Sequence, residues 1–397
     1  MSSIYRREYK RKDKDIALEE ASAVINDLDN WESEWPTFIE KLYSERSELR
    51  LSAMQSMNKT LTARFIGEDI LPFLNDTVTA LIGPITNPVS KAEHDEALGV
   101  ICNLALNTFE EFETFTNTIL NELMPNLKNI AEEQSFRFFS IAFITSFTMS
   151  HHDVCIKVFN RFTDFIIKKK SPNFTPAMIA DCINAIELLV SSLPSDVVAT
   201  ELLPNLKSIL ETAFSVQKHK IILAAIPLFG VVYEALIDYE NGVESEDESA
   251  SSSKTFLFDF RPRLANLSKN IAKKEHKKTI GNEANAVISS IEDEIDEELV
   301  LANQTVHILG RRNNVKLSAI RRITKVHFLQ QMTQNTKIHE MFGFQLMSHA
   351  QALRIKKKYK GDIQRERTMN AKEREREIAK KRKKKDMKEG MFNHEDY

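Results

Sequence analysis

The chain has 397 residues, of which 54 are Lys or Arg, 57 are Asp or Glu and 42% are hydrophobic, and its formal net charge is −3. This length and apolar content allow a sizeable core, nominally in two or three domains, and exclude disorder throughout. There are only 10 glycines and 11 prolines, and no two glycines lie within six residues of each other. This excludes turn-dense β architectures and the glycine-rich loops that bind nucleotide phosphates.

Residues 1–15 form a basic tail, and apolar residues then recur at helical spacing over residues 16–240. The apolar segments are separated by turn signals at Gly67, Gly83-Pro84, Ser171-Pro172 and Ser192-Leu-Pro194. This spacing predicts antiparallel helix pairs. The N-terminus is charged from Arg6 onward, and we therefore expect no secretory signal.

One phrase returns along residues 16–240, as Ile70-Leu-Pro-Phe-Leu74, Leu123-Met-Pro-Asn-Leu127 and Leu202-Leu-Pro-Asn-Leu206. Its prolines are 53 and 79 residues apart, and the second spacing is close to twice 40. Armadillo and HEAT repeats have a period of about 40 to 47 residues. The sequence therefore predicts an all-α, armadillo/HEAT-like helical-repeat solenoid, with an irregular helical bundle as the alternative. The phenylalanine-rich helices between Phe136 and Phe165 are expected to fill its core.

Buried helices are also indicated by the cysteines and by the longest apolar run. Cys102, Cys155 and Cys182 lie far apart in helical contexts, a pattern typical of reduced, buried intracellular thiols. The run from Ile221 to Tyr233 is interrupted by Pro227 and is shorter than the roughly 20 residues that a membrane helix needs. We predict a helix inside the protein and no membrane partner.

Residues 241–254 are acidic and serine-rich and are predicted to be a linker. Ser245 precedes three acids and suits an acidophilic kinase, although a plain solvated linker explains the same composition.

Residues 255–353 are predicted to form a small C-terminal helical module. Its start, where Phe256, Phe258 and Phe260 alternate with other residues, indicates a short extended segment. Helical periodicity then continues from Leu264 to about Leu346. The module carries basic residues that we expect to contact nucleic acid, namely Arg311, Arg312, Arg321 and Arg322.

Residues 354–397 are predicted to be a long basic helix and tail. Ile355, Tyr359 and Ile363 give one apolar stripe that can anchor its first turns. Beyond Gln364 the stripe ends, so this part must project into solvent or into a partner. The residues expected to contact nucleic-acid phosphates here are Arg354, Lys356, Lys357, Lys358, Lys360, Arg365, Arg367, Lys372, Arg374, Arg376, Lys380, Lys381, Arg382, Lys383, Lys384 and Lys385.

The net charge conceals a segregated distribution. Residues 354–388 hold 17 Lys or Arg and 6 Asp or Glu, a balance of +11, so the remainder of the chain carries −14. A basic tail on an acidic body favours binding to phosphate backbones. Two other interpretations remain open: a solvated charged helix without a partner, and a nuclear import signal at Lys380–Lys385.

Motifs for catalysis and metal binding are missing from the sequence. There is no Gly-x-Ser-x-Gly, no His-Glu-x-x-His and no cysteine beside an evident base, and His151 and His152 point to different faces of a helix. We expect no enzymatic activity, no metal site, no cofactor and no small-molecule substrate.

The stretch from His327 to Phe344, preceded by Arg311-Arg312, resembles the C-terminal domain of the interferon-related developmental regulator family. Asn370-Ala371 before a Lys/Arg-rich run is similar too. The segments Leu49–Met57 and Glu93–Leu106 look like the family's first helical repeats, with an Arg-x-x-Ala-Leu-type helix and a Glu-Glu-x-x-x-Ala-type helix.

This resemblance implies an armadillo-like protein without catalytic activity. Members of the family are associated with non-translating ribosomes, where the basic C-terminal segment enters spaces used by tRNA and mRNA. They are also described as transcriptional co-regulators that act with chromatin-modifying complexes. The expected partners are therefore the ribosome, through rRNA and ribosomal proteins, or chromatin co-repressor proteins, with a cytoplasmic location for the first role and a nuclear one for the second.

Overall fold

The computed structural model describes residues 30–108, 112–125, 127, 130–148, 152–167, 174–216, 218–242, 252–267, 274–289, 296–302 and 304–346. Residues Met1–Gly343 form one compact unit and Phe344–Tyr397 a second one. The boundaries predicted at residues 240 and 254 both fall inside the first unit, and the predicted basic helix lies outside the described residues.

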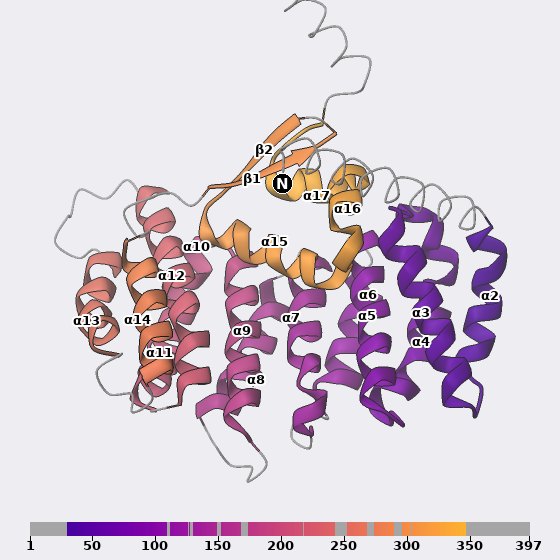
Figure 1. The fold of residues 1–397 in the computed structure, drawn as a ribbon, viewed down its shortest axis with the longest axis horizontal. Helices are drawn as coiled ribbons and strands as arrows, with labels where there is room; N and C mark the ends of the chain where they lie inside the picture. The colour runs from indigo at the N-terminus through magenta and orange to yellow at the C-terminus, as the bar shows by residue number, and fades with distance from the viewer. Residues whose placement is uncertain are drawn as a thin grey trace, which may run out of the picture. The chain divides into compact units, whose positions relative to one another are not determined.

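Helices arranged in sequential pairs make up most of the described chain (Figure 1). The first and second helices of each pair are α2 (Trp31–Leu42) and α3 (Ser47–Ala63), α4 (Leu71–Thr86) and α5 (Lys91–Thr108), α6 (Phe112–Asn117) and α7 (Phe136–Thr148), α8 (His152–Ile167) and α9 (Pro176–Ser192), α11 (Leu203–Ser215) and α12 (His219–Gly242), and α13 (Ser252–Leu267) and α14 (Lys274–Ser289).

Each second helix packs on the second helix of the next pair, in the order α3, α5, α7, α9, α12, α14. The first helices pack on the other side, so the unit has two helical layers. Short turns connect some of the pairs, namely η1 (Gly67–Ile70), α10 (Ser195–Val197) and η5 (Val198–Leu202), and two more, η2 (Thr118–Leu123) and η4 (Glu132–Gln134), lie between α6 and α7. For these helix pairs, the prediction of a helical-repeat architecture is confirmed.

The recurring proline phrase marks the same structural event in different pairs. Pro72 and Pro204 each lie in the first turn of a first helix, α4 and α11, where the missing N–H of proline has no helical partner to lose. The apolar residues two positions before and two positions after each proline are buried, with exposed fractions of 0–2%: Ile70, Leu74, Leu123, Leu127, Leu202 and Leu206. At Pro72 and Pro204 the phrase therefore starts a helix, and in all three places its outer apolar residues pack into the core. By contrast, Gly83-Pro84 lies inside α4 rather than at a turn.

Phenylalanines fill the middle of the unit, as predicted. Phe138 of α7 stands edge-on to Phe162 and Phe165 of α8, with ring centroids 5.6 and 4.8 Å apart. Phe143 is also fully buried. Aromatic side chains of this size dominate the free energy of burial where two layers meet.

The three cysteines and α12 lie in the core, as expected. All three thiols are free and buried, and burial raises the pKa of Cys102 and of Cys155 to about 12. By length and composition α12 could cross a membrane, but 67% of its most apolar stretch is buried inside the protein, which is typical of a core helix.

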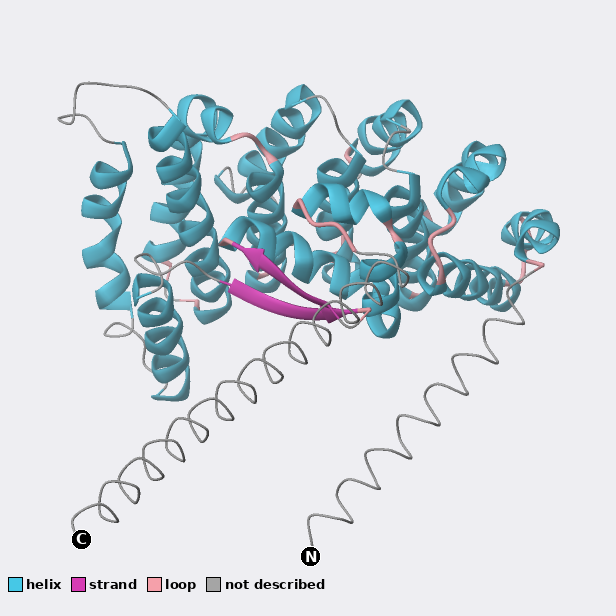
Figure 2. Ribbon diagram, turned by 90° about the horizontal axis from the view of Figure 1, so that it is seen from above, coloured by secondary structure: helices cyan, strands magenta, loops and turns pink. Residues whose placement is uncertain are grey.

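Two predictions for the region after α12 are wrong. The segment from Phe256 to Phe260 is part of α13, not extended. Phe256 and Phe260 are one helical turn apart and buried, whereas Phe258 is 81% exposed. The predicted continuous helical pattern is interrupted by an antiparallel hairpin of β1 (Asp296–Leu301) and β2 (Gln304–Leu309), shown in Figure 2. In the hairpin, buried and exposed residues alternate with period two, which is the pattern of strands with one covered face.

After the hairpin the chain crosses the second-helix layer, in a part that we call the crossing segment (residues 310–343). It contains α15 (Arg311–Thr324), the 3-10 turn η8 (Lys325–His327), α16 (Phe328–Gln334) and α17 (Thr336–Phe342). Helix α15 contacts α12, α9 and α5 in turn, and α16 contacts α3. The crossing segment therefore joins helix pairs that are far apart in the sequence (Figure 1).

Candidate nucleic-acid interface

The predicted nucleic-acid-binding residues divide into two groups in the structure. Those from Arg354 to Lys385 lie outside the described residues. Arg311, Arg312, Arg321 and Arg322 are described and all belong to α15, as one Arg-Arg pair at each end of the helix.

The first turn of α15 is capped by a carboxylate from another helix. The side chain of Glu234, on α12, accepts hydrogen bonds from the backbone N–H groups of Arg311 at 2.6 Å and Arg312 at 3.4 Å. The N–H groups at a helix start have no helical acceptor, and the helix dipole favours a negative charge there. Glu234 therefore fixes the point at which α15 begins.

Gly310 makes this close approach possible. Its φ of 85° and ψ of 155° lie in a region that is essentially limited to glycine. A Cβ atom built on Gly310 would stand 2.6 Å from Oε1 of Glu234, which is a clash. Both the backbone conformation and the space beside it require glycine.

The N-terminal arginine pair is turned into the protein. The Arg311 guanidinium lies against Gly230 of α12, where a Cβ atom would come within 3.2 Å of Nη1, and donates to the carbonyl of Val287 at 3.3 Å. Arg312 donates to the hydroxyl of Ser195 at 2.7 Å and to the carbonyl of Leu193.

Burial sets the protonation behaviour around this pair. Burial lowers the pKa of Arg311, and nearby carboxylates act against this shift. Burial also lowers the pKa of Lys316 to about 8. Burial also raises the pKa of Glu187 to about 8, although Arg311 acts against that shift. The N-terminal end of α15 is thus held by a partly buried network of charges, and a nucleic-acid role for Arg311 and Arg312 stays a prediction.

The C-terminal arginine pair is exposed. Arg321 forms an ion pair with Glu297 of β1 at 2.5 Å, and its guanidinium lies 4.5 Å from the ring centroid of Phe328. Arg322 lies over Phe136 and Phe139 at 5.1 and 4.1 Å. These contacts hold both guanidinium groups at the surface of the unit, Arg321 paired with a carboxylate and Arg322 supported by two aromatic rings.

Farther along, the crossing segment completes the ends of two second helices. The side-chain amide of Gln331 donates to the carbonyls of Leu61, Thr62 and Arg64 at 2.8–3.0 Å. Asn335 donates to the carbonyl of Leu106 at 3.0 Å. The last carbonyls of a helix have no partner within it, so Gln331 and Asn335 satisfy the ends of α3 and α5 and dock the segment there.

The two N-terminal segments of the family resemblance meet in the structure. Arg50 of α3 forms an ion pair with Glu93 of α5 at 2.5 Å, and Glu93, only 1% exposed, also accepts the backbone N–H of Val89 at 2.7 Å. Beside this ion pair, the amide of Asn58 bonds to Glu96 at 2.6 Å, and Asn103 donates to Asn58 at 2.9 Å. A polar seam therefore runs between α3 and α5.

A pocket of about 460 Å³ opens where the crossing segment passes over this seam. It is lined by Gln55, Asn58, Lys59, Thr62, Asp95, Glu96, Gly99, Asn103, Phe136 and residues 322–327. We call it the seam pocket. Its lining combines cations, carboxylates and amides with the ring of Phe136 and the imidazole of His327.

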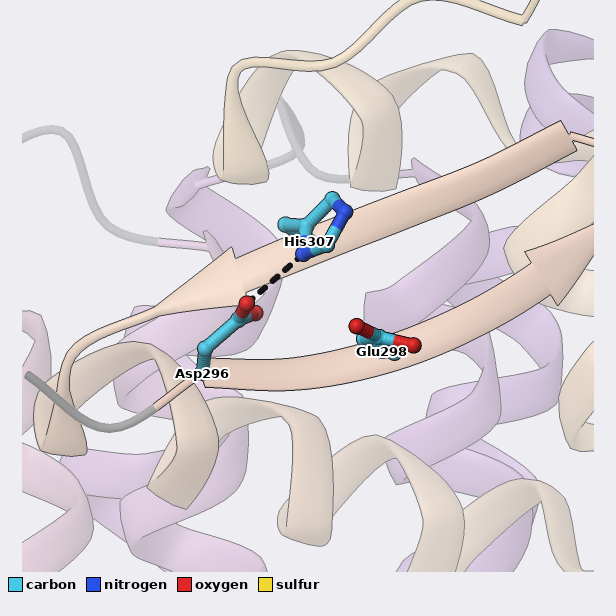
Figure 3. Close-up of side chains that lie close together, drawn as sticks. All are labelled: Asp296, Glu298 and His307. Carbon is cyan, nitrogen blue, oxygen red and sulfur yellow. Dashed lines mark hydrogen bonds and ion pairs between the residues drawn. The ribbon is translucent and has the colours of Figure 1, made fainter.

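The outer face of the hairpin brings together three side chains of metal-binding type (Figure 3). Nδ1 of His307 lies 2.7 Å from a carboxylate oxygen of Asp296, and with Glu298 the three donor atoms lie within 4.8 Å of one another. Asp296 raises the pKa of His307 through this hydrogen bond. All three side chains are exposed, and their hydrogen bonding and strand register account for their closeness. They offer ligands to a divalent cation without requiring one, so the geometry gives no reason to assign a metal.

Several contacts that build this region were not identified from the sequence. Glu234, Gln331, Asn335 and the pair of Arg50 with Glu93 act between elements 43 to 270 residues apart. Gln331 and Asn335 fall within the resemblance motif, and their polar character inside an apolar helical pattern was the available signal. Nothing local to Glu234 distinguishes it from a surface acid.

The comparisons with known proteins bear on the family. The sequence profile of the interferon-related developmental regulator family matches residues 7–281, which include the helices from α2 to α13 and the first half of α14. No curated protein sequence matches the chain. Among solved structures, one described as "Computational Design of Self-Assembling Cyclic Protein Homooligomers" is similar over 68% of this chain and 98% of its own, at 16% identity and a TM-score of 0.21, which is too low to bear on the fold. The family profile covers more than half of the chain, and the protein belongs to the interferon-related developmental regulator family.

Proposed function

We propose that this protein is a non-enzymatic, cytoplasmic ribosome-binding regulator that represses translation or protects idle ribosomes. Its C-terminal segment would lie among rRNA phosphates, and the helical repeats would contact ribosomal protein or rRNA. The observation that carries the proposal is the separation of charge, with +11 on residues 354–388 and −14 on the rest of the chain. An acidic body would be repelled by RNA unless a concentrated basic segment directed its approach.

Two further features support this function. Beyond Gln364 the sequence of the basic segment lacks the apolar residues needed to pack against its own protein, so an external anion gives its charges a partner. On the compact unit, Arg321 and Arg322 hold exposed guanidinium groups on aromatic rings, an arrangement well suited to phosphate.

The test is co-sedimentation of the full-length protein with ribosomes. Replacement of Lys380–Lys385 by six glutamines should weaken binding by about a factor of ten or more, and raising the salt concentration should weaken the natural protein steeply, because each phosphate contact releases counterions. Truncation after Leu353 should abolish binding while leaving the compact unit, which ends at Gly343.

The N-terminal tail provides a matched control, because it also holds six basic residues: Arg6, Arg7, Lys10, Arg11, Lys12 and Lys14. Replacing these six by glutamine should change co-sedimentation far less than the C-terminal replacement. Equal losses in the two variants, or unchanged co-sedimentation after truncation, would reject the assignment of the C-terminal segment.

A second candidate function is a nuclear transcriptional co-regulator that binds co-repressor proteins through the helical-repeat surface. The run Lys380-Lys-Arg-Lys-Lys-Lys385 favours it, since such runs act as import signals. Cell fractionation separates the two functions. Recovery with ribosome-sized particles supports the first, and retention in nuclei after loss of the ribosomal fraction supports the second.

A further inference from the structure

The seam pocket has the size and composition of a ligand site. Its volume of about 460 Å³ falls within the roughly 300–1,000 Å³ typical of small-molecule sites. Three parts of the chain form it: the seam between α3 and α5, the start of α7, and the turn η8 with the end of α15. Because these parts are far apart in sequence, the pocket exists only when the crossing segment is docked.

Positive and hydrogen-bond-accepting groups are both present in the pocket. The cations are Lys59, Arg322 and Lys325, and the acceptors include Asp95 and Glu96. A purely anionic ligand would be repelled by the two carboxylates. A ligand that carries both an anionic group and N–H donors would match both sets.

Asn103 adds an acceptor without a partner. Its side chain is 2% exposed, and its Nδ2 donates to Asn58 at 2.9 Å. No hydrogen bond to its Oδ1 exists among the described residues. A buried acceptor left unpaired costs about 1–3 kcal/mol, and a donor from a ligand in the adjoining pocket would satisfy it.

The pocket lining also includes a flat cation that lies on aromatic rings. The guanidinium of Arg322 lies 4.1 Å from the ring centroid of Phe139 and 5.1 Å from that of Phe136, and both Phe136 and Arg322 line the pocket. Arginine planes and aromatic rings are the surfaces on which unstacked nucleobases rest in single-stranded RNA complexes.

The turn above the pocket has a strained backbone. Lys325 has a φ of 51° and a ψ of −119°, a conformation that costs a non-glycine residue roughly 1–3 kcal/mol. It places Nζ of Lys325 4.0 Å from a carboxylate oxygen of Glu96 at the pocket. Such strain persists where the surrounding contacts fix it, and here it is kept beside a cavity.

We propose that the seam pocket binds a single nucleotide of single-stranded RNA. Lys59 and Lys325 hold the phosphate, Arg322 supports the face of the base, and Glu96 and Asn103 accept hydrogen bonds from its amino or imino groups. This inference rests on the proposed RNA-binding function and adds a second contact, made by the compact unit rather than by the basic segment.

The test uses the full-length protein and the four ribonucleoside 5′-monophosphates, each titrated separately at millimolar concentrations and followed by ligand-observed NMR. We expect saturable binding that depends on the base and is about tenfold or more tighter than that of inorganic phosphate. Binding no better than inorganic phosphate, or absence of binding to all four, would overturn the inference.

Two matched pairs of variants locate the binding. Gln55→Trp should fill the pocket and reduce affinity about tenfold, whereas Ser52→Trp, also exposed on α3 but outside the pocket, should not. Lys59→Gln should weaken binding more than Lys91→Gln, a change of the same charge at an exposed position outside the pocket. Thermal unfolding of each variant confirms that it is folded, and equal effects within either pair would contradict the assignment.

The failure of this inference and that of the proposed function give different results. The variant with Lys380–Lys385 replaced by glutamine should lose ribosome co-sedimentation yet keep mononucleotide binding in the pocket. Loss of co-sedimentation without any nucleotide binding by the natural protein rejects only the pocket. Nucleotide binding together with unchanged co-sedimentation of that variant rejects only the role of the basic segment.

Discussion

Helix α15 carries the same dipeptide, Arg-Arg, at both ends, and the two ends differ in what surrounds them. At Arg311-Arg312 the backbone is capped by Glu234 and the side chains are turned toward α12 and α9. At Arg321-Arg322 the guanidinium groups lie over aromatic rings at the surface. Both pairs have carboxylate neighbours, so the burial of an arginine, and not its place in a basic stretch, determines whether it docks a helix or presents a charge.

The largest effect is expected from the cap of the first pair. Glu234→Ala removes the acceptor for the N–H groups of Arg311 and Arg312 and leaves partly buried positive charge uncompensated, so the free energy of unfolding should fall by about 3 kcal/mol. Urea unfolding measures it. Asp238→Ala removes a carboxylate that is 49% exposed and pairs with Arg312, and should cost no more than about 1 kcal/mol. Equal effects of the two variants would show that the cap does not fix α15.

Gly310→Ala should lower the free energy of unfolding by about 2 kcal/mol, because alanine is strained at this backbone conformation and its Cβ would displace the carboxylate of Glu234. The control is Gly343→Ala. Gly343 also has a positive φ, 69°, but nothing lies within 4 Å of its Cβ position, so we expect a loss of about 1 kcal/mol from backbone strain alone. Melting temperatures in the opposite order would mean that Glu234 can move aside freely.

The network around the first pair should also make stability depend on pH. The pKa of Glu187 rises from 4.5 to about 8, so the folded state keeps a proton that the unfolded state has lost between these values. This contribution to stability is complete below pH 4.5 and is lost as the pH rises through about 8.

Replacing Glu187 by glutamine tests the direction of this pH dependence. The free energy of unfolding of Glu187→Gln should rise relative to that of the natural protein by at least about 1 kcal/mol between pH 5 and pH 9. Urea unfolding at both values gives the difference, and Glu201→Gln, which is an exposed acid on η5, serves as the reference. If the free energy of unfolding of Glu187→Gln differed from that of the natural protein by the same amount at pH 5 and pH 9, the Glu187 carboxyl would not contribute to the pH dependence.

The smallest effect on stability is expected at the second pair. Arg321→Ala and Arg322→Ala each remove an exposed cation over a ring and should cost about 0.5–1 kcal/mol. For Arg322→Ala, nucleotide binding should fall while the melting temperature changes little. A larger loss in the free energy of unfolding for these variants than for Arg311→Ala and Arg312→Ala would contradict the assignment of the docking role to the first pair.

Much of the fold could be predicted because it depends on local pattern. Residues such as Ile70 and Leu74, or Phe138 and Phe162, are apolar at helical spacing and are buried where the repeats meet. The hairpin and α13 were missed because short patterns are ambiguous: Phe256 and Phe260 fit a period of two as well as one helical turn, and only the exposure of Phe258 separates these possibilities. The seam pocket could not be predicted, since Lys59, Glu96 and Arg322 come together only through tertiary packing.

The docking of Gln331 and Asn335 has a consequence for synthesis of the chain. The carbonyls of Leu61 and Thr62 receive their partner from a residue 270 and 269 positions later, which at 5–20 residues per second is made roughly 15–50 s afterwards. The first helix pairs therefore leave the translating ribosome with the ends of α3 and α5 still hydrated. In an open repeat array each unit interacts only with its neighbours. In this protein the contacts that join the first helix pairs to the crossing segment can form only after Gln331 and Asn335 have emerged.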